Sequence, residues 1–226
     1  MTTDLLPFAL LGALLGLDVV SFPQAMISRP LVAATASGAL AGDVGSGLLA
    51  GVVLELMAME TLPVGASRYP EWGTAAVVGG ALAAGMGMER AGTLVIAVFA
   101  AIVTGWAGGW SMYALRKLNG SWAERRLAAL EAGDRRALAG LHLRGLTADL
   151  LRGAALTVAA LVAWHPVVVW LSGRWSIPFA ASSAVLMALA GAVAGGSVWR
   201  LAHGAPGARW YLLGGVAAGA AAVVLR

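Results

Sequence analysis

The chain has 226 residues, of which 60% are hydrophobic and only 12% charged, and its mean hydropathy is +0.83. A soluble domain carries roughly 25% charged residues, so this composition excludes an ordinary soluble domain and indicates an integral membrane protein. The basic residues outnumber the acidic ones, but they concentrate in one interval, which indicates membrane topology rather than nucleic-acid binding. The absence of cysteine excludes disulfides and thiolate metal sites.

Seven apolar stretches follow one another along the chain and predict a single all-α, multi-pass membrane domain over residues 1–226. They are Leu5–Phe22, Leu31–Met59, Thr74–Met88, Gly92–Leu115, Gly153–Leu171, Ile177–Trp199 and Trp210–Leu225. A hydrocarbon core of about 30 Å needs roughly 20 helical residues. Glycine pairs four residues apart predict a tightly packed helical bundle with subunit interfaces. These pairs are Gly12/Gly16, Gly38/Gly42, Gly47/Gly51, Gly105/Gly109, Gly191/Gly195 and Gly215/Gly219.

The second stretch, Leu31–Met59, is too long for one plain span, and the sequence AGDVGSG interrupts it at Ala41–Gly47. Split there, its halves would reach only about 16 Å and about 22 Å at 1.5 Å per residue. Two half-length helices joined through Gly42, Asp43 and Gly47 predict a re-entrant hairpin, which membranes tolerate where protein or a watery cavity covers it. Asp43 is then a candidate N-cap for the second half. One long tilted helix with a glycine kink is the alternative.

Four acidic residues lie at or near membrane depth: Asp18, Asp43, Glu55 and Glu60. Such a residue costs about 2.5–3.5 kcal/mol at a helix centre, so we expect it to pair, to face water or to bind a ligand. Glu55 and Glu60 are five residues apart, or about 140° around a helix, which predicts two separate roles. Asp18 precedes a segment in which Gln24 and Arg29 can donate hydrogen bonds to a carboxylate or to a ligand hydroxyl.

The segment after Glu60, TLPVGASRYPEWG, combines helix breakers with Arg68, Tyr69, Glu71 and Trp72. Carboxylates that accept hydroxyl hydrogen bonds, next to aromatic rings against which a pyranose can pack, predict a sugar site. The alternative is a loop at the membrane interface, with the two aromatic rings among the headgroups and Arg68 paired with Glu71.

The interval Arg116–Arg152 holds eight of the fifteen basic residues and is the only long polar part of the chain. The positive-inside rule predicts that it faces the cytoplasm. Its apolar residues fall loosely on one face, which predicts an amphipathic helix at the headgroups; a solvated loop with helical character is the alternative. We find no zinc, P-loop or nucleophile-elbow motif in the chain, and we expect no catalysis, metal or cofactor.

The sequence from Ser28 to Glu71, SRPLVAATASGALAGDVGSGLLAGVVLELMAMETLPVGASRYPE, resembles the IIC membrane subunit of the mannose/fructose/sorbose family of bacterial phosphotransferase systems. The shared pattern consists of Arg29-Pro30-Leu31, Gly42-Asp43, Gly51, Leu54-Glu55, Gly65-Ala66, Pro70 and Glu71. A weaker match covers Gly133 to Arg152, where His142 and Arg152 fall in register with family positions. Pro63 stands where many members have a polar residue, often Asn.

The resemblance implies a sugar permease subunit in the bacterial inner membrane, paired with a IID membrane subunit in a hetero-oligomer. It also implies re-entrant hairpins, an elevator-like moving core, and cytoplasmic IIAB proteins that phosphorylate the emerging sugar. Glu55 and the turn around Gly65 would belong to the sugar site. Together with the residues above, the candidate sugar ligands are Asp18, Gln24, Glu55, Glu60, Gly65 and Arg68.

Two other functions stay open at this point. A stand-alone transporter would use Glu55 or Glu60 as a proton relay, and a membrane scaffold or sensor would need the acids only for helix packing.

Overall fold

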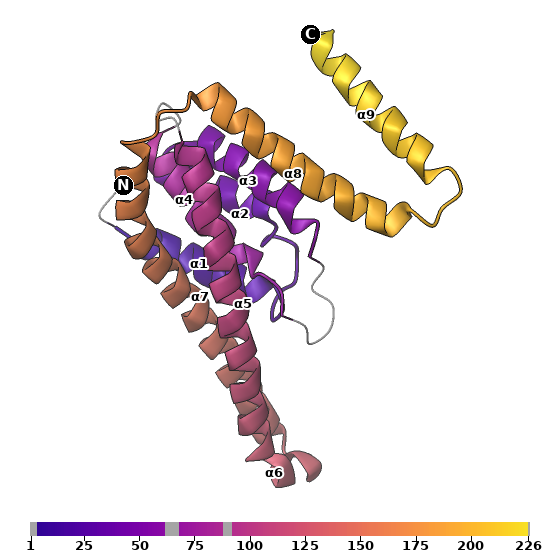
Figure 1. Cartoon of the computed structure of the whole chain (residues 1–226). Helices are drawn as coiled ribbons and strands as arrows, with labels where there is room; N and C mark the ends of the chain where they lie inside the picture. The colour runs from indigo at the N-terminus through magenta and orange to yellow at the C-terminus, as the bar shows by residue number, and fades with distance from the viewer. Residues whose placement is uncertain (1–3, 62–67, 88–91, 226) are drawn as a thin grey trace.

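The computed structural model describes residues 4–61, 68–87 and 92–225, and the regular elements in these ranges are all α-helices. They are α1 (Leu6–Asp18), α2 (Pro30–Ala41), α3 (Val44–Ala58), α4 (Trp72–Met86), α5 (Thr93–Glu124), α6 (Leu127–Glu131), α7 (Arg135–Ser172), α8 (Phe179–Ala202) and α9 (Ala208–Val224). The predicted all-helical fold is confirmed (Figure 1).

The helix is interrupted between α2 and α3, so the alternative of one long helix is wrong. Gly42 ends α2 in a left-handed conformation with φ 92°, and Asp43 Oδ1 accepts a hydrogen bond of 3.0 Å from Ser46 N at the start of α3. Asp43 therefore is the predicted N-cap. The two helices pack closely and antiparallel: a Cβ on Gly47 would lie 2.5 Å from the Ala34 carbonyl oxygen, and one on Gly51, a turn later in α3, would lie 3.0 Å from the Pro30 carbonyl oxygen, a turn earlier in α2. The re-entrant placement of this hairpin in a membrane stays a prediction.

Helix α4 lies at the centre of the body, where α1, α2, α3, α5 and α7 surround it. All its residues from Gly73 to Ala84 are buried. Helices α1 to α4 have only 12 to 15 residues, which at 1.5 Å per residue gives about 18–22 Å and is short for a span. The end of α1 and the start of α4 place two acidic residues in the interior, since Asp18 is 2% and Glu71 0% exposed.

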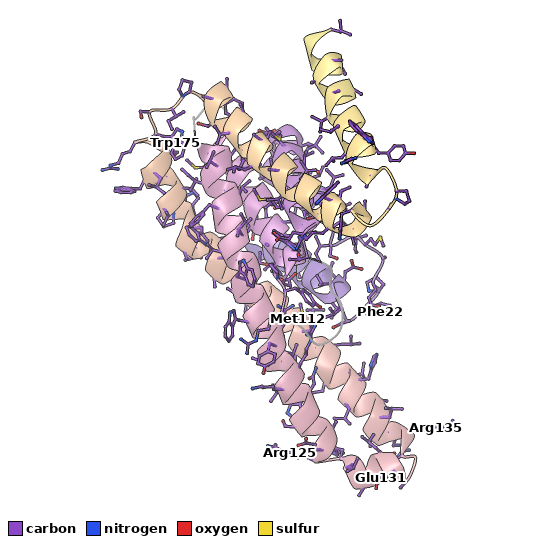
Figure 2. The ribbon with its side chains drawn as sticks, turned by 45° about the vertical axis from the view of Figure 1, so that its right-hand side comes forward. Phe22, Met112, Arg125, Glu131, Arg135 and Trp175 are labelled. Atoms are coloured by element: carbon purple, nitrogen blue, oxygen red, sulfur yellow. The ribbon has the colours of Figure 1, made fainter. Side chains whose placement is uncertain are left out.

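Three of the described helices, α5, α7 and α8, are long and apolar enough to cross a membrane. Helix α5 does not end at Leu115, nor does α7 begin at Gly153; instead both continue through the basic interval. Their extensions and α6 form an antiparallel arm, which we define as residues 113–148. The arm projects from the body, with Arg125, Glu131 and Arg135 at its far end (Figures 1 and 2). The interval is thus helical, while its cytoplasmic location stays a prediction.

The C-terminal helix α9 stands away from the body and, among the described helices, packs against α8 (Figure 1). The predicted glycine pairs divide accordingly. Those in α1, α3 and α5 lie at contacts, where a Cβ would come within 3.3 Å of a neighbouring atom. A Cβ on the glycines of the pairs in α8 and α9 would have nothing within 4 Å among the described residues, so no close helix approach requires glycine there.

Candidate functional site

A cavity of about 300 Å³ opens on one side of the body, between three segments. The first, which we call the α1–α2 wall, is the connection between those helices and contributes Asp18, Val19, Gln24, Met26, Ser28 and Arg29. The second is the end of α3, with Ala58 and Thr61. The third, the α4 wall, contributes Tyr69, Pro70 and Trp72. Two of the predicted ligands, Asp18 and Gln24, therefore line the same cavity as the predicted aromatic residues.

Asp18 holds the backbone of the α1–α2 wall by hydrogen bonds. Its carboxylate is 2% exposed and accepts hydrogen bonds from the backbone N–H groups of Ala25, at 2.7 Å, and Ser28, at 2.9 Å. A buried carboxylate with two backbone donors fixes the path of the chain around it. Asp18 thus has a structural role as well as a place in the cavity.

Two cavity residues hold an unusual backbone conformation. Gln24 and Met26 have φ values of +58° and +61°, which residues other than glycine adopt rarely. The Gln24 side chain donates to the Val20 carbonyl oxygen at 2.8 Å, and the two bonds to Asp18 hold the segment between Ala25 and Ser28. Strained residues of this kind tend to cluster at ligand sites.

Glu55 lies beside the cavity rather than in its lining. Its carboxylate pairs with the Arg29 guanidinium and accepts a hydrogen bond of 3.2 Å from Leu31 N. Helix α2 has no side-chain cap of its own, so Glu55 supplies from α3 an acceptor for an N–H in the first turn of α2. Glu55 therefore positions Arg29, which does line the cavity; direct sugar contact by Glu55 stays a prediction.

The aromatic side of the cavity is anchored by hydrogen bonds. Trp72 Nε1 donates to Thr61 Oγ1 at 2.9 Å, which joins the α4 wall to the end of α3. The Tyr69 hydroxyl accepts a hydrogen bond of 2.8 Å from Arg116 Nη2. Both rings are held at fixed positions, as a surface for stacking requires.

The remaining predicted ligands lie elsewhere. Glu60 is exposed and 3.5 Å from Arg200 on α8. Arg68 is exposed and lies over the rings of Trp110 and Tyr113, 4.1 Å and 4.3 Å from their centroids. The alternative pairing of Arg68 with Glu71 is wrong, because Glu71 has other partners. Gly65 and Pro63 lie outside the described residues.

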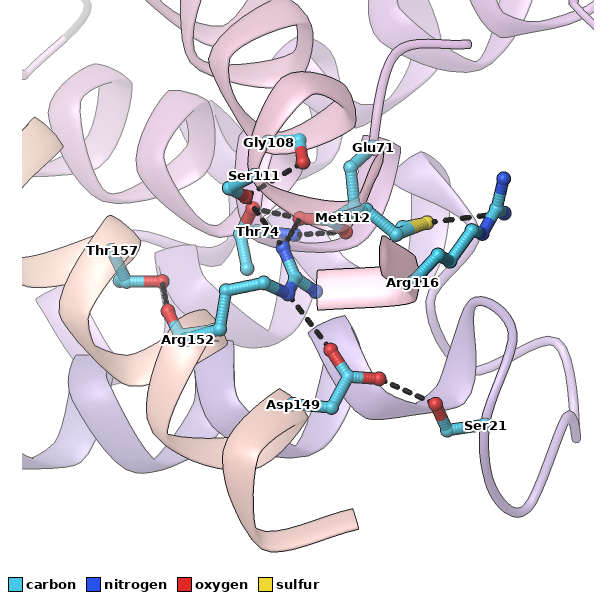
Figure 3. A network of polar contacts seen from close by, with 11 residues as sticks. Ser21, Glu71, Thr74, Gly108, Ser111, Met112, Arg116, Asp149, Arg152 and Thr157 are labelled. Carbon is cyan, nitrogen blue, oxygen red and sulfur yellow. Dashed lines mark hydrogen bonds and ion pairs between the residues drawn. The ribbon is translucent and has the colours of Figure 1, made fainter. Parts of the chain in front are cut away.

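The structure contains a buried cluster of Glu71, Asp149 and Arg152 that the sequence did not predict (Figure 3). Glu71 is fully buried at the N-terminus of α4, where its Oε1 accepts from Thr74 N at 3.0 Å and its Oε2 accepts from the Thr74 hydroxyl. Arg152 Nη1 lies 3.8 Å from Glu71 Oε2, and Arg152 Nε donates to Asp149 Oδ1 at 2.8 Å. In the sequence, Glu71 and Arg152 stood out only because both match positions of the family pattern. That match did not indicate that the two side chains lie together.

The lining of the cavity carries both hydrogen-bonding groups and aromatic rings. Its lining combines a carboxylate, an amide, hydroxyls and a guanidinium with two aromatic rings. These groups can exchange hydrogen bonds with hydroxyls and stack on an apolar ring face. Within the described residues, no three histidine, aspartate or glutamate side chains gather as a metal site.

The fold and the three long apolar helices define a polytopic helical membrane protein. A sequence model of the family described as "PTS system sorbose-specific IIC component" matches residues 4–173, and the chain belongs to this family of sugar-transport permease components of phosphotransferase systems. A solved structure titled "Structure of membrane protein" is similar to the chain with a TM-score of 0.75 and 20% identity, over 97% of this chain and 87% of the other. No curated protein matches the chain.

Proposed function

We propose that this chain binds a hexose or related sugar in the cavity between the α1–α2 wall, the end of α3 and the α4 wall, and carries it across the bacterial inner membrane. The cavity carries this proposal. Its volume of about 300 Å³ lies at the small end of the ~300–1,000 Å³ usual for small-molecule sites, which suits a monosaccharide. Its polar groups and its two anchored rings match the two kinds of surface that a pyranose presents.

Family membership also supports a proposal for the rest of the transport complex. A IID membrane subunit would complete the membrane assembly, and cytoplasmic IIAB proteins would phosphorylate the sugar, so this chain would do no chemistry itself. The α2–α3 hairpin and the walls that it supports would move as the core of an elevator-like cycle. The arm, which holds seven of the eight basic residues of the interval, would offer a docking surface for acidic patches on IIAB.

Uptake by cells tests this proposal. The chain and its partner subunits are expressed in cells without a related permease, and uptake of radiolabelled D-mannose, D-fructose and L-sorbose is measured. We expect Trp72→Ala to reduce uptake by about tenfold or more because it removes the stacking surface. Trp210→Ala, on the exposed face of α9, is the matched control and should leave uptake unchanged.

The same assay separates the proposal from the other transport mechanism. A phosphotransferase permease needs phosphoenolpyruvate and resists a protonophore. Uptake that a protonophore abolishes and that does not need phosphoenolpyruvate would instead identify a stand-alone, proton-coupled transporter. Equal uptake by Trp72→Ala and Trp210→Ala would remove the cavity from the transport path.

A further inference from the structure

We infer that Arg152 and Asp149 are positioning residues that hold two walls of the cavity in place from outside it, an inference that rests on the proposed function. Both residues come from α7, which contributes nothing to the cavity lining. They lie one helical turn apart and share the hydrogen bond from Arg152 Nε to Asp149 Oδ1. Figure 3 shows that the cluster reaches the α1–α2 connection at Ser21 and the N-terminus of α4 at Glu71.

The link to the α1–α2 wall runs through Ser21. Its hydroxyl donates to Asp149 Oδ2, and it lies between Val19 and Gln24, which both line the cavity. Asp149 itself is 2% exposed. A buried carboxylate on a long, rigid helix therefore fixes one point of a segment that contains no regular secondary structure between Asp18 and Pro30.

The link to the α4 wall runs through Glu71. This residue lies between Pro70 and Trp72, which both line the cavity. Its backbone N–H donates to the Gly105 carbonyl oxygen at 2.8 Å, and its carboxylate faces Arg152 Nη1. There is no room for a larger neighbour, because a Cβ on Gly108 would lie 2.9 Å from Glu71 Cβ.

Arg152 joins the two links. Its side chain is 9% exposed, and its guanidinium lies against the carboxylates of Asp149 and Glu71. Its Nη1 also lies 3.2 Å from the Ser111 hydroxyl oxygen. One guanidinium thus faces two buried carboxylates, each tied to a different wall. A planar guanidinium can address several acceptors at fixed angles, which a lysine cannot do. Each wall is therefore held relative to α7, and the two are held relative to each other.

The absence of cysteine from the chain allows a direct test that needs no sugar. A nitroxide spin label is attached to Gln24→Cys on the α1–α2 wall, or to Arg68→Cys beside the α4 wall, in the purified full chain in lipid. Ala139→Cys, on the exposed surface of the arm, is the control. Label mobility is read from the continuous-wave EPR line shape.

The two links predict different results for different substitutions. Asp149→Asn and Ser21→Ala should increase the mobility of the label at residue 24 and leave the label at residue 68 unchanged. Arg152→Gln should increase mobility at both positions, because it leaves the Asp149 and Glu71 carboxylates, each tied to one wall, without the guanidinium that they share. No substitution should affect the label at residue 139. Ser21 is exposed, so Ser21→Ala keeps the test informative if a buried substitution prevents folding.

Sugar uptake adds the functional readout. In the variants that insert normally, we expect the apparent KM to rise about tenfold, the change that losing roughly one hydrogen bond's contribution gives, with a smaller change in the maximal rate. Mobility that increases equally at all three positions, or at none, would overturn the inference. If uptake by the wild-type chain fails while the labels behave as expected, the proposed function is wrong but the positioning role stands.

Discussion

At the scale of single residues, the acidic groups of the body are held by donors from the backbone and by arginine. Asp18 accepts from Ala25 and Ser28, Asp43 caps α3, and Glu55 joins Arg29 to the start of α2. Burying a carboxylate with such partners costs much less free energy than burying one without them. These acids therefore fix chain segments that have no regular secondary structure.

Asp43 offers a simple test of this role. Asp43→Ala removes the acceptor for Ser46 N and should lower the free energy of unfolding by about 1 kcal/mol, as loss of an N-cap usually does. Asp43→Ser retains a capping oxygen and should stay within a few tenths of a kcal/mol of the wild type. Denaturant titration of the protein in detergent micelles measures both. An equal loss in the two variants would contradict the capping role.

Substitutions of Glu55 test whether this carboxylate supports the cavity through Arg29. Glu55→Ala leaves the Arg29 guanidinium without its partner and the Leu31 N–H without its acceptor, so we expect it to lower sugar uptake. Glu55→Gln keeps an acceptor oxygen for Leu31 N and should retain more uptake than the alanine variant. Radiolabelled uptake, normalised to the amount of inserted chain, measures the difference. Undiminished uptake by Glu55→Ala would remove this residue from the transport path.

At the scale of helices, the α2–α3 hairpin and the buried α4 form the support of the cavity. The hairpin depends on close backbone approach: a Cβ on Gly47 would lie 2.7 Å from Gly38 Cα as well as 2.5 Å from the Ala34 carbonyl oxygen. Backbone atoms cannot give way as the end of a flexible side chain can. The register of the hairpin therefore requires glycine at this position.

A matched pair of substitutions tests the packing of the hairpin. Gly47→Ala should lower the free energy of unfolding by about 1–3 kcal/mol, the usual cost of overpacking. Gly45→Ala, two residues earlier in the same helix, meets its nearest atom at an ordinary 3.4 Å and should have little effect or stabilise the helix. Similar stabilities for the two variants would contradict the antiparallel contact.

Some of these elements could be predicted from the sequence because local preferences determine them. Others could not, because they depend on the rest of the fold. The break at Gly42 and the cap at Asp43 could be predicted because turn and capping preferences are local. The continuation of α5 past Leu115 could not, because hydropathy marks where a helix leaves the membrane and not where it ends. Nor could the meeting of Glu71 with Arg152, which are 81 positions apart and are brought together only by tertiary packing.

At the scale of the whole molecule, the arm and the body divide the chain into two parts of different character. The arm carries seven of the fifteen basic residues. It extends about 20 Å beyond Asp149, because fourteen residues of α7 precede Asp149 at 1.5 Å each. The body holds the cavity and the short helices. Positive-inside bias predicts that the arm faces the cytoplasm, on the side where phosphorylation occurs in the proposed cycle.

The sidedness of the arm can be measured with Ala139→Cys, since the natural chain has no other cysteine. A membrane-impermeant maleimide should modify this residue in inside-out vesicles and leave it unmodified in intact cells. Disruption of the cells with detergent gives the full extent of labelling as a reference. Rapid modification in intact cells would place the arm outside and contradict the proposed docking of cytoplasmic partners.

The most direct test of the sugar site is protection of a cysteine inside the cavity. Ala58 lines the cavity and is only 4% exposed, so reagent should reach Ala58→Cys mainly through the space that the sugar would occupy. We predict that the transported sugar slows maleimide modification of Ala58→Cys in a concentration-dependent manner, while labelling of Ala139→Cys stays constant. If a sugar that the cells take up leaves the rate at residue 58 unchanged at saturating concentration, the cavity is not the sugar site.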